Sequence, residues 1–254
     1  MKVVILAGGL GTRISEETQT KPKPMVEIGG YPILWHIMNH YSKFGHDDFL
    51  ILLGYKGYII KEYFVNYFIH NSDFTIDLKE NSIDIINRQN LNWKITLIDT
   101  GISSMTGSRV KKAEKYLNSE PFLLTYGDGV TDLNINETIE FHQTHQGHVT
   151  MTSAQPDGRF GALEIIENQV VSFKEKPKGD GSWINAGFFV CNNEIFKYIN
   201  DLDNEVLEQA PLKNLAKDGK LFTFKHNGFW MPMDTLRDKI KLDHMWNENK
   251  APWK

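Results

Sequence analysis

Apolar runs bounded by turn residues alternate along this chain with segments of helical periodicity, and this alternation restricts the fold more than any other feature. The strand candidates are Lys2–Leu6, Asp48–Leu53, Ile95–Asp99, Pro121–Tyr126 and Val149–Ala154. Between them, Pro32–Phe44 and Tyr58–Ile69 each place apolar side chains on one helical face. The pattern predicts an α/β fold in which helices cover both faces of a mostly parallel sheet.

The pattern changes beyond about residue 155. Short strand candidates there, which indicate mixed or antiparallel pairing, are Ala162–Ile166, Val170–Phe173 and Ile184–Val190. Helical stretches are expected near 193–219 and an amphipathic helix over Thr235–Asn247. Residues 72–94, rich in Asp and Asn, predict an insertion or hairpin. Because no linker or repeat is visible, we expect residues 1–254 to form a single domain.

Composition excludes several classes of function. The net charge is −4 and the Lys and Arg residues are scattered, so we expect no binding to nucleic acid or to a membrane surface. Cys191 is the single cysteine, which excludes an internal disulfide, and its apolar neighbours predict a buried thiol. The N-terminus has no signal-peptide pattern and no apolar run is long enough to span a bilayer. We therefore expect a cytoplasmic protein.

A glycine-rich loop follows the first predicted strand, where Leu-Ala-Gly-Gly-Leu-Gly-Thr-Arg occupies positions 6–13. Glycines let the backbone approach a ligand closely and turn successive N–H groups toward one point, which makes a pocket for phosphate oxygens. Arg13, Lys21 and Lys23 add positive charge beside this loop. The combination predicts a nucleoside triphosphate site, because a polyanion needs both amides and cations to hold it. The loop by itself would also suit an ordinary βα turn.

Two common glycine motifs do not fit this loop. The dinucleotide fingerprint G-x-G-x-x-G, started at Gly9, requires a glycine where this chain has Ile14. The P-loop requires Gly-Lys-Ser/Thr, whereas Gly11 is followed by Thr12 and Arg13. The sequence therefore argues against a dehydrogenase and against a P-loop ATPase.

Two aspartates are candidates for holding a metal ion. Asp128 lies within Gly-Asp-Gly after the strand candidate Pro121–Tyr126, at the sheet edge where ligands of open α/β folds bind. Mg²⁺ takes one or two protein carboxylates and completes its coordination with phosphate oxygens and water. Asp234 is the best candidate for the second carboxylate. The alternatives are an Asx turn at Asp128 and a helix N-cap at Asp234, which precedes Thr235 and a periodic segment.

Polar residues in the second half suit a sugar phosphate. Glu175 and Lys176 offer an acceptor and a cation, and Gly161 and Asn185 lie in the same half of the chain. Sugar hydroxyls call for acceptors such as carboxylates and for amides. A solvated charge pair at Glu175 and Lys176 is the alternative.

Other candidate chemistry finds little support. His142, His145 and His148 have no cysteine or acidic residue at zinc-ligand spacing, so we expect surface histidines. No Gly-x-Ser-x-Gly elbow accompanies any serine, which argues against acyl transfer.

Several of these motifs occur together in one enzyme family. The chain resembles the sugar-1-phosphate nucleotidyltransferases over nearly its whole length. The residues that carry this resemblance are Leu-Ala-Gly-Gly-Leu-Gly-Thr-Arg at 6–13, Lys-Pro-Lys-Pro-Met at 21–25, Gly-Asp at 127–128, Glu-Lys-Pro at 175–177 and Asn185. A second set is similar to the branch that uses CTP: Ser-Glu-Glu-Thr at 15–18, Trp-His-Ile-Met at 35–38, Gly-Tyr-Lys-Gly-Tyr at 54–58, Asp-Thr-Gly at 99–101, Ser-Ser-Met-Thr-Gly at 103–107, Gly-Arg-Phe-Gly-Ala-Leu at 158–163 and Gly-Phe-Trp-Met-Pro-Met-Asp-Thr at 228–235.

The resemblance implies a fold and an activity. The fold is the nucleotide-diphospho-sugar transferase type, with a Rossmann-like nucleotide part over about 1–154 and a smaller sugar-phosphate part over about 155–254. The activity is transfer of a cytidylyl group from CTP to glucose 1-phosphate, giving CDP-glucose and pyrophosphate. The resemblance also implies a homo-oligomer, with a hexamer as one candidate assembly, and a product used for dideoxysugars of surface polysaccharide such as the O-antigen of lipopolysaccharide.

The resemblance further assigns roles to individual residues. It implies catalytic roles for Arg13, Lys23 and Lys176, and a Mg²⁺ ion held by Asp128 and Asp234, in preference to the N-cap at Asp234. The nucleotide-binding residues would be Leu6, Ala7, Gly8, Gly9, Leu10, Gly11, Thr12, Arg13, Lys23, Ser104, Arg109 and Gly127. The sugar-phosphate-binding residues would be Gly161, Glu175, Lys176 and Asn185.

Base selectivity suggests a hypothesis for Arg109. Arginine donors suit the O2 and N3 acceptors of cytosine, whereas uracil presents an N3–H at the same place. Two other functions stay open: a uridylyl or thymidylyl transferase acting on a hexose 1-phosphate, and a catalytically silent nucleotide-binding module on the same fold.

Overall fold

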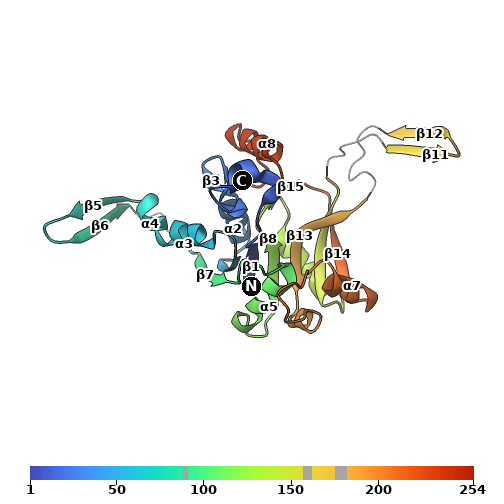
Figure 1. Ribbon diagram of the computed structural model, residues 1–254, viewed down its shortest axis with the longest axis horizontal. Helices are drawn as coiled ribbons and strands as arrows, with labels where there is room; N and C mark the ends of the chain where they lie inside the picture. The colour runs from blue at the N-terminus through green and yellow to red at the C-terminus, as the bar shows by residue number, and fades with distance from the viewer. Residues whose placement is uncertain (88–90, 157–161, 175–181) are drawn as a thin grey trace.

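The computed structural model describes residues 1–87, 91–156, 162–174 and 182–254. A seven-stranded sheet runs through its centre in the order β14-β10-β13-β8-β1-β4-β7 (Figure 1). The strands of this sheet are β1 (Lys2–Ala7), β4 (Asp48–Leu53), β7 (Lys94–Asp99), β8 (Phe122–Tyr126), β10 (Val149–Ala154), β13 (Ile184–Cys191) and β14 (Leu221–His226). Within the sheet, pairs are parallel except where β13 meets β8 and β10. The predicted mostly parallel sheet and the mixed pairing of the second half are confirmed.

Helices cover both faces of the sheet. The α-helices are α1 (Ser15–Thr18), α2 (Ile33–Lys43), α3 (Gly57–Val65), α4 (Tyr67–His70), α5 (Thr106–Ala113), α6 (Ile135–Gln143), α7 (Ala210–Lys217) and α8 (Leu236–Asn247). Val3 and Ile5 of β1 belong to a buried cluster that includes α2. Val4 and Leu6, which point to the other face, belong to a second cluster that includes α5 and α7. Burial on both faces is the reason that the strands read as continuous apolar runs. None of the helices in the described residues is long and apolar enough to cross a membrane.

Short strands and hairpins complete the fold. Two hairpins, β5 (Asp73–Asp77) with β6 (Ser82–Asn87) and β11 (Ala162–Ile166) with β12 (Gln169–Lys174), project from opposite sides of the body as two arms (Figure 1). The first of them confirms the hairpin expected within residues 72–94. The remaining short strands are β2 (Glu27–Ile28), β3 (Tyr31–Pro32), β9 (Gly129–Thr131) and β15 (Trp230–Pro232).

Two predicted helical segments differ in detail. The segment predicted as one helix over Tyr58–Ile69 is divided into α3 and α4 at Asn66, whose side chain donates to the Glu62 carbonyl at 2.9 Å. Asparagine competes with the backbone in this way and so interrupts helices. Within 193–219, the structure has a 3₁₀-helix over Asn193–Lys197 as well as α7.

The expectation of a surface position is wrong for His142, which is 6% exposed. Its Nδ1 lies 2.8 Å from Thr150 Oγ1, and His145 Nε2 lies 2.8 Å from the same oxygen. The last turn of α6 thus packs on β10, where Thr150 supplies a partner for Nδ1 of His142, while Nε2 of the same ring is buried without a hydrogen-bond partner among the described residues. Cys191 is buried as predicted, and burial raises the pKa of its thiol.

Two further histidines, His36 and His40, lie buried on α2. Their Nε2 atoms lie 2.8 Å from the carbonyl oxygens of Ile28 and Leu133, respectively. Burial lowers the pKa of each from 6.5 to about 4. The unfolded chain therefore binds protons at a higher pH than the folded chain does. The stability that these neutral rings contribute is complete above pH 6.5 and is lost as the pH falls toward 4.

We expect His40→Gln, whose amide can still donate to Leu133, to make the free energy of unfolding depend less on pH below about pH 7. Between about pH 7 and pH 5 the wild type should lose about 2 kcal/mol more unfolding free energy than the variant. Urea unfolding at both pH values, followed by circular dichroism, measures the difference. His244→Gln, at an exposed ring on α8, is the control and should behave as the wild type. Equal losses for His40→Gln and the wild type would contradict the prediction.

Candidate active site

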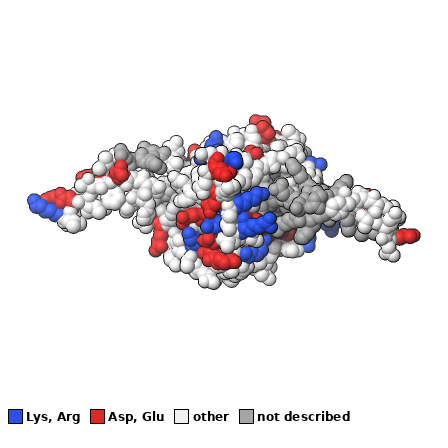
Figure 2. Space-filling view, turned by 90° about the horizontal axis from the view of Figure 1, so that it is seen from above, with Lys and Arg blue, Asp and Glu red and all other residues white. Residues whose placement is uncertain are grey.

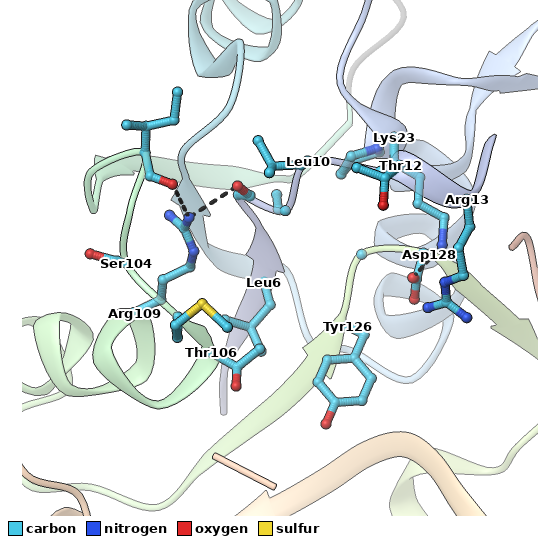
Figure 3. A pocket seen from close by; sticks show the side chains of 18 of the residues that line it. Leu6, Leu10, Thr12, Arg13, Lys23, Ser104, Thr106, Arg109, Tyr126 and Asp128 are labelled. Atoms are coloured by element: carbon cyan, nitrogen blue, oxygen red, sulfur yellow. Dashed lines mark hydrogen bonds and ion pairs between the residues drawn. The ribbon is translucent and has the colours of Figure 1, made fainter. Parts of the chain in front are cut away.

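A cavity of about 500 Å³ opens where β1 and β8 end (Figure 3). The chain passes from β1 to β4 on one side and reaches β8 on the other, so the loops after β1 and β8 diverge and leave a crevice, as at the ligand sites of open α/β sheets. Its volume suits a small-molecule ligand. The residues that line it are Leu6, Ala7, Gly8, Gly9, Leu10, Gly11, Thr12, Arg13, Lys23, Pro24, Ile102, Ser103, Ser104, Met105, Thr106, Arg109, Tyr126, Gly127 and Asp128. Every residue predicted to bind the nucleotide is among them; the contact with a nucleotide stays a prediction.

The backbone conformation of the glycine loop requires glycine at two of its positions. Gly11 has a φ of +67°, which side chains rarely tolerate. A Cβ added at Gly8 would lie 2.3 Å from the Arg109 guanidinium. A Cβ at Gly9 would meet no atom within 4 Å. Gly8 and Gly11 are therefore required by the protein itself, whereas Gly9 leaves open space beside the cavity.

The two predicted metal ligands lie together because two short strands pair. β9 follows Asp128, β15 precedes Asp234, and the two strands are antiparallel with Pro232 opposite Gly129. The pairing continues with a hydrogen bond of 2.8 Å from Met233 N to the Asp128 carbonyl. Residues that are distant in the sequence thereby lie together, with Asp128 among the residues that line the cavity and Asp234 next to them.

One lysine bridges the two aspartates. Lys23 Nζ lies 2.7 Å from Asp128 Oδ2 and 2.7 Å from Asp234 Oδ1. Arg13 Nη1 lies 2.6 Å from Asp234 Oδ2. The Lys23 side chain is only 10% exposed, which strengthens its pairing relative to a surface ion pair. Two carboxylates and two cations thus balance at this corner. Seen from above, acidic and basic side chains also gather side by side near the middle of the body, between the arms (Figure 2).

Other assignments near this corner need correction. The N-cap of α8 is Thr235, not Asp234: its side chain accepts from Asp238 N, and the Asp238 carboxylate accepts from Thr235 N. Asp234 is therefore free of the capping role. Lys21 pairs with Glu27 at 3.0 Å and is absent from the residues found to line the cavity.

The donor set at this corner fits Mg²⁺. Asp128 and Asp234 are partly exposed and offer carboxylate oxygens, which hard cations prefer. Within the described residues no group of three or more His, Cys, Asp or Glu side chains is arranged to hold a metal. Two carboxylates are what Mg²⁺ uses when phosphate oxygens and water supply the remaining ligands.

Arg109 lies at the other end of the cavity from Asp128 in the view of Figure 3. Its guanidinium is buried and donates to the carbonyls of Gly8, Leu53 and Gly101 at 2.9 to 3.0 Å. Burial lowers the pKa of Arg109. Arg109 thus ties the glycine loop to the loop after β7, and its contact with cytosine stays a prediction. Ser104, close by, is buried and accepts from Lys112 Nζ at 2.8 Å.

Of the four residues predicted to bind the sugar phosphate, the structure describes only Asn185. Gly161, Glu175 and Lys176 lie outside the described residues. Asn185 lies on β13 beside the cavity rather than among the residues found to line it, and its Nδ2 is 3.4 Å from the Tyr126 hydroxyl.

The sequence analysis assigned no role to Tyr126 or Thr106, which line the cavity, or to Glu208, which contacts both. Tyr126 directly precedes Gly127 and Asp128 at the end of a predicted strand, which could have marked it. Glu208 lies in an irregular segment with no motif, and the sequence carries no signal for it.

Comparison with known proteins places this geometry in a family. The family model described as nucleotidyl transferase matches residues 2–233. Glucose-1-phosphate cytidylyltransferases of Salmonella typhimurium and Salmonella typhi are each 58% identical over 255 residues, which covers 100% of this chain and 99% of each relative. The crystal structure of HddC from Yersinia pseudotuberculosis matches with a TM-score of 0.70 and 25% identity, over 96% of this chain and 99% of that one. This protein therefore belongs to the nucleotidyl transferase family.

Proposed function

We propose that this protein transfers the cytidylyl group of CTP to glucose 1-phosphate, with CDP-glucose and pyrophosphate as products. The observation that carries the proposal is a cavity lined by the glycine loop, Lys23 and Asp128, with Asp234 held next to it through its ion pair with Lys23. Identity of 58% over the whole chain to the Salmonella glucose-1-phosphate cytidylyltransferases supports the choice of both substrates.

The chemistry needs charge neutralisation more than a general base. A sugar phosphate has a second pKa near 6, so its attacking oxygen is already ionised at neutral pH. The obstacle is the repulsion between this anion and the triphosphate, and positioning is the main task. Arg13 and Lys23 would offset charge on the phosphates, and the amides of the glycine loop would orient them. Mg²⁺ held by Asp128 and Asp234 would add a Lewis acid that polarises phosphoryl oxygens.

The remaining site residues and the assembly are part of the same proposal. Glu175, Lys176, Gly161 and Asn185 would bind glucose 1-phosphate within the part of the chain after about residue 154. A homo-oligomer is supported by apolar side chains on the arms that are more than half exposed, namely Ile76, Leu78, Ile83, Ile86, Val170 and Phe173. We place the enzyme in the cytoplasm, where CTP is available, as a supplier of nucleotide sugar for surface polysaccharide.

One assay tests this function. The protein is incubated with Mg²⁺, glucose 1-phosphate and each of CTP, UTP, dTTP and GTP, and pyrophosphate release and product mass are measured. CTP should give the highest kcat/KM, with CDP-glucose as the product. Preference for UTP or dTTP would support a uridylyl or thymidylyl transferase instead. Absence of pyrophosphate with all four would support a silent binding module.

Arg109→Ala should weaken the nucleotide site. Removal of the guanidinium takes one donor from each of the buried carbonyls of Gly8 and Leu53, which keep their bonds from Tyr55 N and Thr100, and it removes the side-chain link between the glycine loop and the loop after β7. We expect KM for CTP to rise about tenfold or more, which corresponds to about 1.4 kcal/mol. Steady-state kinetics with CTP and UTP measure it, and a fall in the CTP-over-UTP ratio would favour direct reading of cytosine. If KM for CTP and this ratio were both unchanged, Arg109 would have no role at the nucleotide.

A further inference from the structure

Tyr126 forms part of the cavity wall at the point where β8 ends. Its hydroxyl donates to Glu208 Oε1. Burial, followed by the charge of Glu208, raises the pKa of Tyr126, so the hydroxyl keeps its proton and remains a donor. On the other side of the ring, a Cβ added to Gly187 would lie 2.4 Å from Tyr126 Cδ2. The tyrosine ring is therefore confined between the glycine of β13 and the cavity.

Glu208 also contacts a second residue that lines the cavity, Thr106. Its second oxygen, Oε2, accepts from Thr106 Oγ1 at 2.7 Å. Thr106 begins α5, lines the cavity, and accepts in turn from Leu207 N at 2.9 Å. The same irregular segment is fixed nearby by a bond of 2.9 Å from Met105 N to the Asp203 carbonyl. One carboxylate thus connects the wall that carries Tyr126 with the wall that carries Thr106.

The Tyr126 hydroxyl also contacts Asn185. Asn185 Oδ1 accepts from Gly187 N at 2.8 Å, which turns Nδ2 toward the Tyr126 hydroxyl at 3.4 Å. The hydroxyl donates to Glu208 and accepts from Asn185, so its donor and one acceptor site are both defined. A chain of hydrogen bonds runs from Thr106 through Glu208 and Tyr126 to Asn185.

We propose that Glu208 is a positioning residue for the sugar-phosphate side of the site, acting through Tyr126 on Asn185. This inference rests on the proposed function, in which Asn185 binds glucose 1-phosphate. Glu208 needs two acceptor oxygens for this task, one for each wall. A glutamine would supply one acceptor and one donor, so only one of the two hydroxyls, that of Thr106 or that of Tyr126, could still donate to residue 208.

The test uses Glu208→Gln, Tyr126→Phe and the double variant in the full-length enzyme. In each single variant we expect KM for glucose 1-phosphate to rise about tenfold, with kcat lowered less than threefold and KM for CTP changed by less than a factor of three. Because Tyr126→Phe removes the hydroxyl through which Glu208 would act on Asn185, the double variant should be no worse than the worse single variant. A partial loss of folded protein would lower the apparent kcat and leave both KM values unchanged, because only the amount of active enzyme falls. Additive effects in the double variant would show that Glu208 does not act through Tyr126.

Asp218→Asn is the matched control. It removes the charge from the acceptor of another tyrosine–carboxylate hydrogen bond, of 3.1 Å from the Tyr198 hydroxyl to Asp218, and neither residue is among those found to line the cavity. This variant should keep both KM values. If Glu208→Gln melts below the assay temperature, Tyr126→Phe decides alone, and a wild-type KM for glucose 1-phosphate in that variant would overturn the inference. If the wild type makes no CDP-glucose, the proposed function fails instead, so the two failures are distinguishable.

Discussion

Asp128→Asn is expected to reduce kcat about 10² to 10³ fold while the protein still folds. The substitution keeps the size of the side chain but removes the charge that faces Lys23 at 2.7 Å and that would hold Mg²⁺. The Mg²⁺ concentration for half-maximal rate should rise as well. Initial rates over a Mg²⁺ titration at saturating CTP and glucose 1-phosphate measure both effects, and thermal melting checks the fold.

The control for this prediction is Asp48→Asn. Asp48 begins β4 at the other end of that strand from the cavity and forms an exposed ion pair of 3.5 Å with Lys94, so its loss should leave kcat unchanged. Full activity of Asp128→Asn at every Mg²⁺ concentration would reject the metal role of Asp128.

Lys23→Met should produce a rate loss of similar size and a second effect on metal binding. The variant loses the cation that would offset phosphate charge, so kcat should fall about 10² to 10³ fold. The Lys23 ammonium also lies between Asp128 and Asp234 in the nucleotide-free protein. Without it the two carboxylates lose the cation that they share. Mn²⁺ should therefore bind to the nucleotide-free variant more tightly than to the wild type. Electron paramagnetic resonance of Mn²⁺ titrations, without CTP, measures the second effect.

Lys21→Met is the matched control, because it removes a lysine from the same motif that pairs with Glu27 instead. It should leave kcat and Mn²⁺ binding near wild-type values. Equal Mn²⁺ affinity in Lys23→Met and the wild type would show that Lys23 does not compete with the metal for the aspartates.

Sequence reasoning found the strands of the parallel part because both of their faces are buried. β4 and β10 have the predicted bounds, and β1, β7 and β8 differ by one residue at one end. Strand order was beyond reach, since the insertion of β13 between β8 and β10 depends on contacts across the chain. The break at Asn66 was missed because apolar periodicity continues through it.

Some residues of the site could likewise be predicted from the sequence and others could not. The glycine loop, Lys23 and Asp128 are recognisable because their chemistry lies in short contiguous motifs. The proximity of Asp234 depends on strands of three residues, β9 and β15, which are too short to show a period of two. Aspartate and threonine are both good caps, so the sequence left the cap of α8 uncertain by one position. Glu208 acts through contacts with Thr106 and Tyr126 that no spacing reveals.

The pairing of β15 with β9 has a consequence for synthesis of the protein on the ribosome. The glycine loop, Lys23 and Asp128 leave the exit tunnel well before the segment that delivers Asp234. A nascent chain would thus display the glycine loop and Lys23 with only one of the two aspartates proposed to hold Mg²⁺. If Asp234 holds Mg²⁺ as proposed, turnover of CTP would begin only after β15 has been synthesised and has paired with β9, so that shorter nascent chains do not consume the nucleotide.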